Sequence, residues 1–264
     1  SGGNLNTARG FGSSAGPHAA NLYFGGTTTN NNSTFSNNTE SYDGSSWTEV
    51  ADLNQAKFAS GGVGASNTAA LMYGGNIPGD TANTESWDGS SWTETSNLNT
   101  ARHGIASAGA SNTSALAVGG SGGEANNESW NGSAWTEVGD LNTDRHTAAG
   151  AGTTTAAIVF GAGSPTAVVE SWNGSAWTEM NDLNTGRGNL AGSGTQTLAL
   201  AFGGNAPPRT VNTEDWNGVT WAETTNLSTA RYDLTGAQQG GTSNNLAIGG
   251  NTAPAQVAST EEWS

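Results

Sequence analysis

A ten-residue phrase repeats along this chain, and it constrains the fold more than any other feature. Residues 128–137 read ESWNGSAWTE, and residues 170–179 read the same ten letters. Near-copies begin at Glu40, Glu85 and Glu214, and a shortened copy, EEWS, begins at Glu261. The aromatic residues in the third place of the six copies are separated by 45, 43, 42, 44 and 47 residues. Such a period is typical of repeat proteins whose unit is a small sheet.

Each complete copy predicts a β-hairpin. Its Asn-Gly or Asp-Gly pair favours a two-residue type I′ turn, in which both central residues take positive φ. With Asn131 and Gly132 as the turn, Trp130 is expected opposite Ser133, and Glu128 opposite Trp135. The alternation of side chains then places both tryptophans and Glu128 on one face. All ten tryptophans hold these two hairpin positions, so we expect the rings to form the core.

Two further motifs predict the remaining strands of each repeat. A Leu-Asn-Thr-Ala-Arg-like motif is followed by a stretch rich in Gly, Ala and Ser, and then by an apolar strand that ends on glycines, as in NLYFGG. The repeats begin near Leu5, Leu53, Leu98, Leu141, Leu183 and Leu227. We therefore expect an all-β chain in which residues 1–264 form a single domain of six four-stranded units.

The order of these motifs resembles the Kelch repeat. That repeat carries a double glycine after its second strand, a Glu-x-aromatic on its third, a Trp on its fourth and an Arg before the next unit. The resemblance covers the whole chain and implies a six-bladed β-propeller around a central channel. The wording of the repeats is also similar to tandem repeats in structural proteins of tailed phages of marine bacteria.

The two ends of the chain complement each other. The last repeat stops at Trp263 and Ser264 without an outer strand, and the chain opens SGGNLNTAR, which aligns with the EVGDLNTDR that follows Trp135. We expect residues 1–4 to lie beside the strand that ends at Trp263 and so to close the last blade. The chain is also interpreted as a segment of a longer repeat protein.

Composition excludes several classes of partner. With 7 basic and 22 acidic residues the net charge is −15, and nucleic acid or anionic lipid would require clustered Lys and Arg. No apolar run is long enough to span a membrane, so we expect no membrane insertion. The absence of cysteine removes thiolate chemistry and the Tyr-Cys crosslink of galactose oxidase, and we predict no cofactor.

Charged motif residues are interpreted as structural. Six cations hold one repeat position and six glutamates hold another, one of each per repeat, so buried ion pairs that tie blades together are expected. The cations are Arg9, Lys57, Arg102, Arg145, Arg187 and Arg231, and the glutamates are Glu40, Glu85, Glu128, Glu170, Glu214 and Glu261. The alternative is a ring of cations that binds an anion in the channel.

The segment between the glycine pair and the Glu-x-Trp strand differs most between repeats, at 7 to 13 residues. In an up-and-down blade these loops emerge on one rim, and variable loops on a rigid scaffold commonly form recognition surfaces. The residues that follow the motif cation also vary; two of them are histidines, but metal binding is not predicted. The predicted ligand contacts are Phe35, Ile77, Pro78, His103, His146, Pro207, Pro208, Arg209 and Tyr232.

The neutral surface, rich in amides and hydroxyls, favours a non-enzymatic recognition or display module that binds a glycan or a protein. We expect it on a virion surface or outside cells, as part of a larger repeat protein or virion assembly. Two alternatives stay open. One is a channel enzyme that acts on an acidic sugar, similar to a sialate epimerase, and the other is a disk that only spaces or decorates an assembly.

Overall fold

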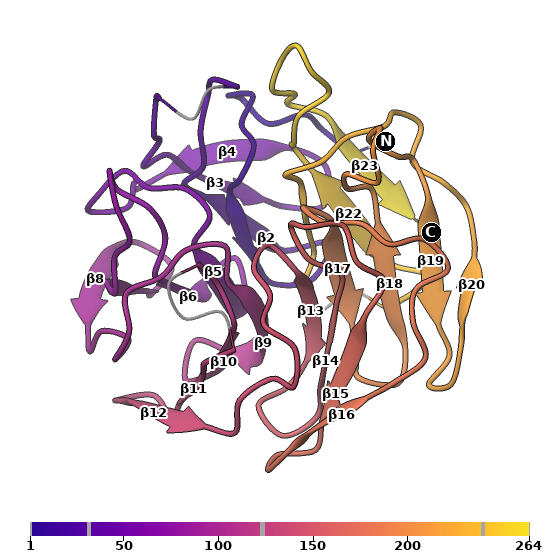
Figure 1. Cartoon of the computed structure of the whole chain (residues 1–264). Helices are drawn as coiled ribbons and strands as arrows, with labels where there is room; N and C mark the ends of the chain where they lie inside the picture. The colour runs from indigo at the N-terminus through magenta and orange to yellow at the C-terminus, as the bar shows by residue number, and fades with distance from the viewer. Residues whose placement is uncertain (1, 31–32, 122–124, 239–240, 264) are drawn as a thin grey trace.

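The computed structural model describes residues 2–30, 33–121, 125–238 and 241–263, and these residues form a six-bladed β-propeller (Figure 1). Every strand pairing in the six sheets is antiparallel, and no helix occurs in the described part of the chain. The first strands of neighbouring blades contact each other, so they surround the axis. The predicted all-β propeller with six blades is confirmed. Among the described residues, no helix is long and apolar enough to cross a membrane.

Five sheets have four strands in chain order, and the sixth sheet has three described strands. Blades 1 to 3 contain β1 (Ser13–Ala15), β2 (Asn21–Phe24), β3 (Thr39–Tyr42) and β4 (Trp47–Val50); β5 (Gly61–Ser66), β6 (Ala69–Tyr73), β7 (Thr84–Trp87) and β8 (Trp92–Thr95); and β9 (Ala106–Ser111), β10 (Ser114–Val118), β11 (Asn127–Trp130) and β12 (Trp135–Val138). Blades 4 to 6 contain β13 (Ala149–Gly152), β14 (Ala157–Phe160), β15 (Val169–Trp172) and β16 (Trp177–Glu179); β17 (Ala191–Gly194), β18 (Ala199–Phe202), β19 (Thr213–Trp216) and β20 (Trp221–Glu223); and β21 (Thr235–Gly236), β22 (Asn245–Ile248) and β23 (Thr260–Trp263).

The turn between the third and fourth strands differs from the predicted type I′ turn. In blade 3, Trp130 lies opposite Trp135 and Glu128 lies opposite Glu137, so the loop has four residues and the predicted register is wrong. The Asn131 side-chain oxygen accepts backbone hydrogen bonds from Ser133 and Ala134 at 2.9 and 3.0 Å. Because this Asx turn shapes the loop, only its glycine takes positive φ, at 96°. The two tryptophans still share one face.

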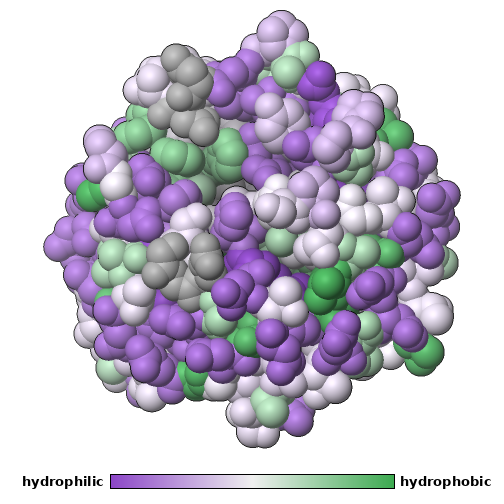
Figure 2. All heavy atoms as spheres, in the orientation of Figure 1, coloured by the Kyte–Doolittle hydropathy of each residue, from purple (hydrophilic) through white to green (hydrophobic). Residues whose placement is uncertain are grey.

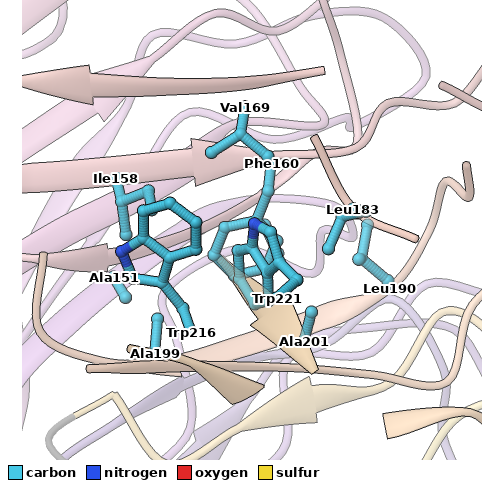
Figure 3. Packing of buried hydrophobic residues seen from close by; sticks show 11 residues of the cluster. Ala151, Ile158, Phe160, Val169, Leu183, Leu190, Ala199, Ala201, Trp216 and Trp221 are labelled. Atoms are coloured by element: carbon cyan, nitrogen blue, oxygen red, sulfur yellow. The ribbon is translucent and has the colours of Figure 1, made fainter. Parts of the chain in front are cut away.

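The hydrophobic core lies between the blades. Each of six buried clusters joins residues of two neighbouring blades. Between blades 4 and 5, Phe160 of β14 packs edge-on against Trp221 of β20 with ring centroids 5.0 Å apart, and Trp216 lies toward Ile158 (Figure 3). Burying such rings stabilises each contact between blades, so the expected aromatic core is present but is divided among six seams.

An inter-blade hydrogen bond accompanies this packing in three seams. The indole N–H of an outer-strand tryptophan donates to the threonine that begins the third strand of the preceding blade. The pairs are Trp47 with Thr260, Trp92 with Thr39 and Trp135 with Thr84, at 3.1 to 3.2 Å. In blade 4 the acceptor is the backbone oxygen of Gly139.

The seam between blades 5 and 6 is built differently. The threonine in the equivalent position of blade 5 is Thr213, and its buried hydroxyl has no hydrogen-bond partner among the described residues. Trp263, which ends the third strand of blade 6, packs instead against Phe202 of blade 5 with centroids 5.0 Å apart. Its indole donates to the Thr225 oxygen at 3.2 Å, the counterpart of Gly139 in blade 5. Trp263 thus fills the place that an outer-strand tryptophan fills elsewhere.

The two ends of the described chain meet at blade 6 (Figure 1). Leu5 donates its backbone N–H to the Ala258 oxygen at 2.8 Å, which is the bond that Leu53 makes to Asn37 and Leu98 to Ala82 in complete blades. Residues 2–4 form no strand, and among the described residues β23 pairs only with β22. Ser1 and Ser264 lie outside the described residues, so the closure by residues 1–4 stays a prediction.

Candidate functional site

The six motif cations and six motif glutamates form six ion pairs, which we call the anchor pairs. Each cation lies in the linker that enters a blade, and its glutamate lies on the third strand of that blade. The pairs are Arg9–Glu40 (2.7 Å), Lys57–Glu85 (3.2 Å), Arg102–Glu128 (2.7 Å), Arg145–Glu170, Arg187–Glu214 (2.9 Å) and Arg231–Glu261 (2.8 Å). The cations are buried, and burial lowers the pKa of Lys57 while Glu85 acts in the opposite direction.

The same glutamates hold the linker itself. In blade 3 one carboxylate oxygen of Glu128 accepts the Arg102 bond, and the other accepts both the backbone N–H and the side-chain amide of Asn99 at 2.8 Å. Four other blades repeat this contact with Asn6, Asn54, Asn142 and Asn184. Since each linker comes from the preceding blade, the anchor pairs lie within one blade but tie it to its neighbour.

Two residues after each cation, the linkers form a closed ring of backbone hydrogen bonds around the axis. We call its members the mouth ring: Phe11, Ala59, Gly104, Thr147, Asn189 and Asp233. Each donates its N–H to the oxygen of the ring member in the preceding blade at 2.7 to 3.1 Å, and Phe11 closes the ring by donating to Asp233. All six have positive φ between 50 and 65°. The repeat thus fixes one backbone shape at six places and leaves the side chains free to differ.

The mouth ring and the first strands line a central cavity of about 110 Å³. Its lining consists mostly of Gly, Ala and Ser. Ile105, Leu190 and Leu234, each the residue after a mouth-ring member, and Gln238 also line it. Several serine hydroxyls of the lining join neighbouring blades, as Ser13 does by donating to the Ser60 oxygen at 2.6 Å. No Arg, Lys or His is among the described lining residues, so no motif cation faces the cavity.

Asp233 is the one ionisable side chain among the described residues that line the cavity, and it is 4% exposed. One carboxylate oxygen accepts a hydrogen bond from the Asn189 amide at 2.6 Å, and Thr147 in turn donates to Asn189 at 3.2 Å. Burial raises the pKa of Asp233 to about 8, with the Asn189 bond acting in the opposite direction. Half of the mouth ring is therefore a polar chain that ends on a carboxyl group without a cationic partner among the described residues.

Beside this mouth, the linkers of blades 1 to 3 and the longest loop form an aromatic patch of Phe11, Phe35, Phe58 and His103. Phe58 is central: its ring centroid lies 5.1 Å from that of Phe35, 5.7 Å from that of Phe11 and 6.3 Å from that of His103. All four side chains are half-buried. Partly exposed aromatic rings supply large contact area at low entropic cost, as binding surfaces use them. Two of the predicted contacts, Phe35 and His103, are thus brought together by Phe58.

The other two predicted contacts in the linkers, His146 and Tyr232, lie apart from this patch. His103 Nδ1 lies 2.5 Å from an Asp80 carboxylate oxygen, whereas His146 lies in the next blade, where its backbone oxygen accepts a hydrogen bond from Gly163. Tyr232, in blade 6, exchanges backbone bonds with Asn251, and burial raises its pKa with Arg209 acting in the opposite direction.

The loop residues that we predicted as contacts fall into two groups. Ile77 and Pro78 belong to the β6–β7 loop, whose Asn76 and Asp80 form a bridge, and Asp80 joins this loop to His103. Pro207, Pro208 and Arg209 belong to the β18–β19 loop of blade 5, where Arg209 bridges to Asn205. Most of the face seen in Figure 2 is hydrophilic, with hydrophobic residues gathered in separate groups.

The site residues that the sequence analysis did not select are the mouth ring, Phe58 among the aromatics, and Asn189 with Asp233 in the cavity. A signal for them was present. The position two residues after each motif cation holds six different residue types within an otherwise repetitive linker, and that position proves to line the channel. The sequence alone could not predict that Asp233 is buried without a cationic partner, because the residues that bury it come from several blades.

The sequence matches no protein-family model, and no curated protein matches it. The resemblance to Kelch repeats accordingly rests on the motifs of the chain, and the structure shows the propeller architecture alone.

Proposed function

We propose that this chain is a non-enzymatic recognition module that binds a glycan or a protein through the propeller face that carries its variable loops. The aromatic patch carries the proposal. Three phenylalanines and a histidine from three blades and one long loop come together on a rim that is otherwise rich in amides and hydroxyls. Clustered, partly exposed rings with polar neighbours are the usual centre of a binding surface.

The anchor pairs support this proposal over the acidic-sugar enzyme. An enzyme of that kind needs a cation in the channel to hold the carboxylate of its substrate, and all six motif cations are bonded to glutamates instead. The described residues of the cavity wall present a single carboxyl group, that of Asp233, which would repel such a substrate when ionised. A location on a virion or extracellular surface is part of the same proposal, and it rests on the wording of the repeat motifs alone.

A glycan array probed with the labelled chain tests the proposal. Replacing Phe35 and Phe58 together by serine should reduce binding to the recognised glycan by at least tenfold, because central aromatic contacts commonly contribute 2 kcal/mol or more each ("hot spots"). Replacing the β2–β3 loop residues 28–37 by a short Gly-Ser linker should abolish or redirect the binding. If the ligand is a protein, the same variants are compared for binding to that protein.

The matched control is Val219→Ser, which removes a side chain that is 63% exposed from the Asn217–Gly218 turn of blade 5. These turns lie beside the hairpins of the first two strands, as Gly44 lies beside Ala19, and so on the opposite rim. If Val219→Ser lost binding while the phenylalanine variant bound fully, the binding surface would lie on the rim of the Asn-Gly turns and the proposal would be wrong. Absence of any ligand for the intact chain would favour the spacer disk.

A further inference from the structure

We propose that the central cavity binds a small organic ammonium ion, with the Asp233 carboxylate as its counter-ion and the Phe11 ring beside it. The site differs from the loop surface proposed above because its counter-ion lies inside the mouth ring, and the two adjoin at Phe11, which lines the cavity and also belongs to the aromatic patch. It depends on blades 5, 6 and 1, which supply Asn189, Asp233 and Phe11.

The cavity has the size and the chemistry for such a ligand. Its volume of about 110 Å³ exceeds the roughly 30 Å³ that one water molecule occupies in the liquid. Asp233 is 4% exposed, and among the described residues only the Asn189 amide hydrogen-bonds its carboxylate. An ammonium group that entered the cavity would supply the missing donors and the missing charge, while Ala and Leu side chains of the lining would contact its alkyl chain.

A monovalent organic cation fits better than a metal ion. Calcium takes six to eight oxygen ligands and magnesium a strict octahedron, commonly with several carboxylates, and the described lining offers one carboxylate. The backbone oxygens of the mouth ring are already used in its six hydrogen bonds. Phe11 follows Asp233 in that ring, where its backbone N–H donates to the Asp233 backbone oxygen at 2.8 Å, and both residues line the cavity. An aromatic residue in the wall of a site that holds a carboxylate favours an alkylammonium ion.

The charged groups around Asp233 leave its charge uncompensated. Arg231, two residues earlier, is bonded to Glu261, and Arg187 of blade 5 and Arg9 of blade 1 are bonded to Glu214 and Glu40. The titratable groups that sense the Asp233 charge are Tyr23 and Tyr232: burial is the main cause that raises the pKa of each, and the Asp233 charge acts in the same direction. A bound cation therefore has no competitor for the carboxylate among the described residues.

Binding is coupled to release of a proton. Burial raises the pKa of Asp233 to about 8, so at neutral pH the folded protein holds the carboxyl group mostly in its neutral form. The ammonium ion pairs with the ionised form, and the proton of Asp233 leaves to solvent as the ion pair forms. The apparent affinity should therefore rise about tenfold for each pH unit below the pKa of Asp233 and level off above it.

Isothermal titration calorimetry with n-propylammonium chloride on the full chain tests this site. We expect saturable binding at pH 8, about fivefold weaker binding at pH 7, and release of up to one proton when the titration is repeated in buffers of different ionisation enthalpy. n-Propanol, which has nearly the same shape and no charge, should bind at least tenfold more weakly. These comparisons need no variant, so they do not depend on how a mutant folds.

Asp233→Asn keeps the shape of the side chain and should abolish both the binding and the proton release. Its matched control is Asp144→Asn, at an exposed linker residue, which should bind like the parent chain. The proposal is overturned if n-propylammonium does not bind at pH 8, if n-propanol binds equally well, or if a folded Asp233→Asn variant binds with unchanged affinity.

Discussion

The anchor pairs and the mouth ring lie two residues apart in every linker, yet the repeat treats them in opposite ways. At the anchor position every blade has a buried cation bonded to a glutamate. At the mouth position every blade has the same positive φ and the same backbone bond, but six different side chains: Phe11, Ala59, Gly104, Thr147, Asn189 and Asp233.

This difference indicates that the propeller depends on side-chain contacts at the anchor position and on backbone contacts at the mouth position of each repeat. Leaving either member of a buried ion pair without its partner is costly, and the anchor position is Arg or Lys in all six repeats of this chain. The mouth ring is held by backbone groups, which any residue provides. Its side chains are therefore available for a ligand, and the three predictions below test that division between scaffold and site.

The largest effect is expected at the anchor position. Arg102→Ala leaves the Glu128 carboxylate buried without its cation, so we expect the free energy of unfolding to fall by about 3–5 kcal/mol. Urea denaturation measures it. The control is Arg209→Ala, the seventh basic residue, which forms no ion pair among the described residues and should change stability by less than about 0.5 kcal/mol. Equal effects of the two substitutions would show that the anchor pairs do not hold the blades.

A smaller, pH-dependent effect is expected at Asp233. Its pKa is raised from 3.8 to about 8 in the folded chain. Between these values the unfolded chain loses the proton while the folded chain keeps it, so this group makes the fold less stable as the pH rises from about 4 to about 8, with no further loss above. Asp233→Asn lacks that loss. Measured at pH 4 and pH 8, its stability relative to the parent should increase by on the order of a few kcal/mol.

A constant difference between the parent chain and Asp233→Asn across this pH range would mean that the carboxyl group is hydrated or paired. The same measurement on Asp144→Asn shows how much of any pH dependence comes from exposed carboxylates. Because Asp144 is exposed, its removal should leave a difference from the parent chain that hardly changes with pH.

The smallest effect concerns the backbone of the mouth ring. Gly104→Ala at φ 65° introduces a Cβ in the left-handed region and 3.0 Å from the Thr147 methyl carbon, so it should lower stability by about 1–2 kcal/mol. Ala59→Gly at φ 54° makes the opposite change at the equivalent place and should raise stability by about 0.5 kcal/mol. Thermal unfolding of the two variants checks the signs. Effects of the same sign would indicate that the ring does not share one strained backbone.

Much of the fold could be predicted from the sequence because the same strand and turn motifs recur in six repeats. The period, the glycine pairs and the paired tryptophans predicted six blades, and one cation and one glutamate per repeat predicted the ion pairs. The type I′ register was wrong because the Asn131 side chain forms its own hydrogen bonds in the turn, which the Asn-Gly pair alone does not reveal.

The candidate site was predicted less well. Phe35 and His103 were selected as loop and linker residues, but Phe58, whose ring joins them, was not selected. Their contact depends on how a long loop folds over the next blade, and loop conformation is set by tertiary packing rather than by local sequence preference.

The sequence by itself therefore determined the repeating unit, since period, turn glycines and hydrophobic alternation are local and recur in each copy. Only the tertiary structure decided what happens where the copies meet. Closing six units around an axis brings residues 42 to 48 positions apart, and also Asp233 and Phe11 from the two ends of the chain, into one hydrogen-bonded ring. The same closure buries Asp233 without a cationic partner in the described part of the chain, and its burial depends on residues from several blades at once.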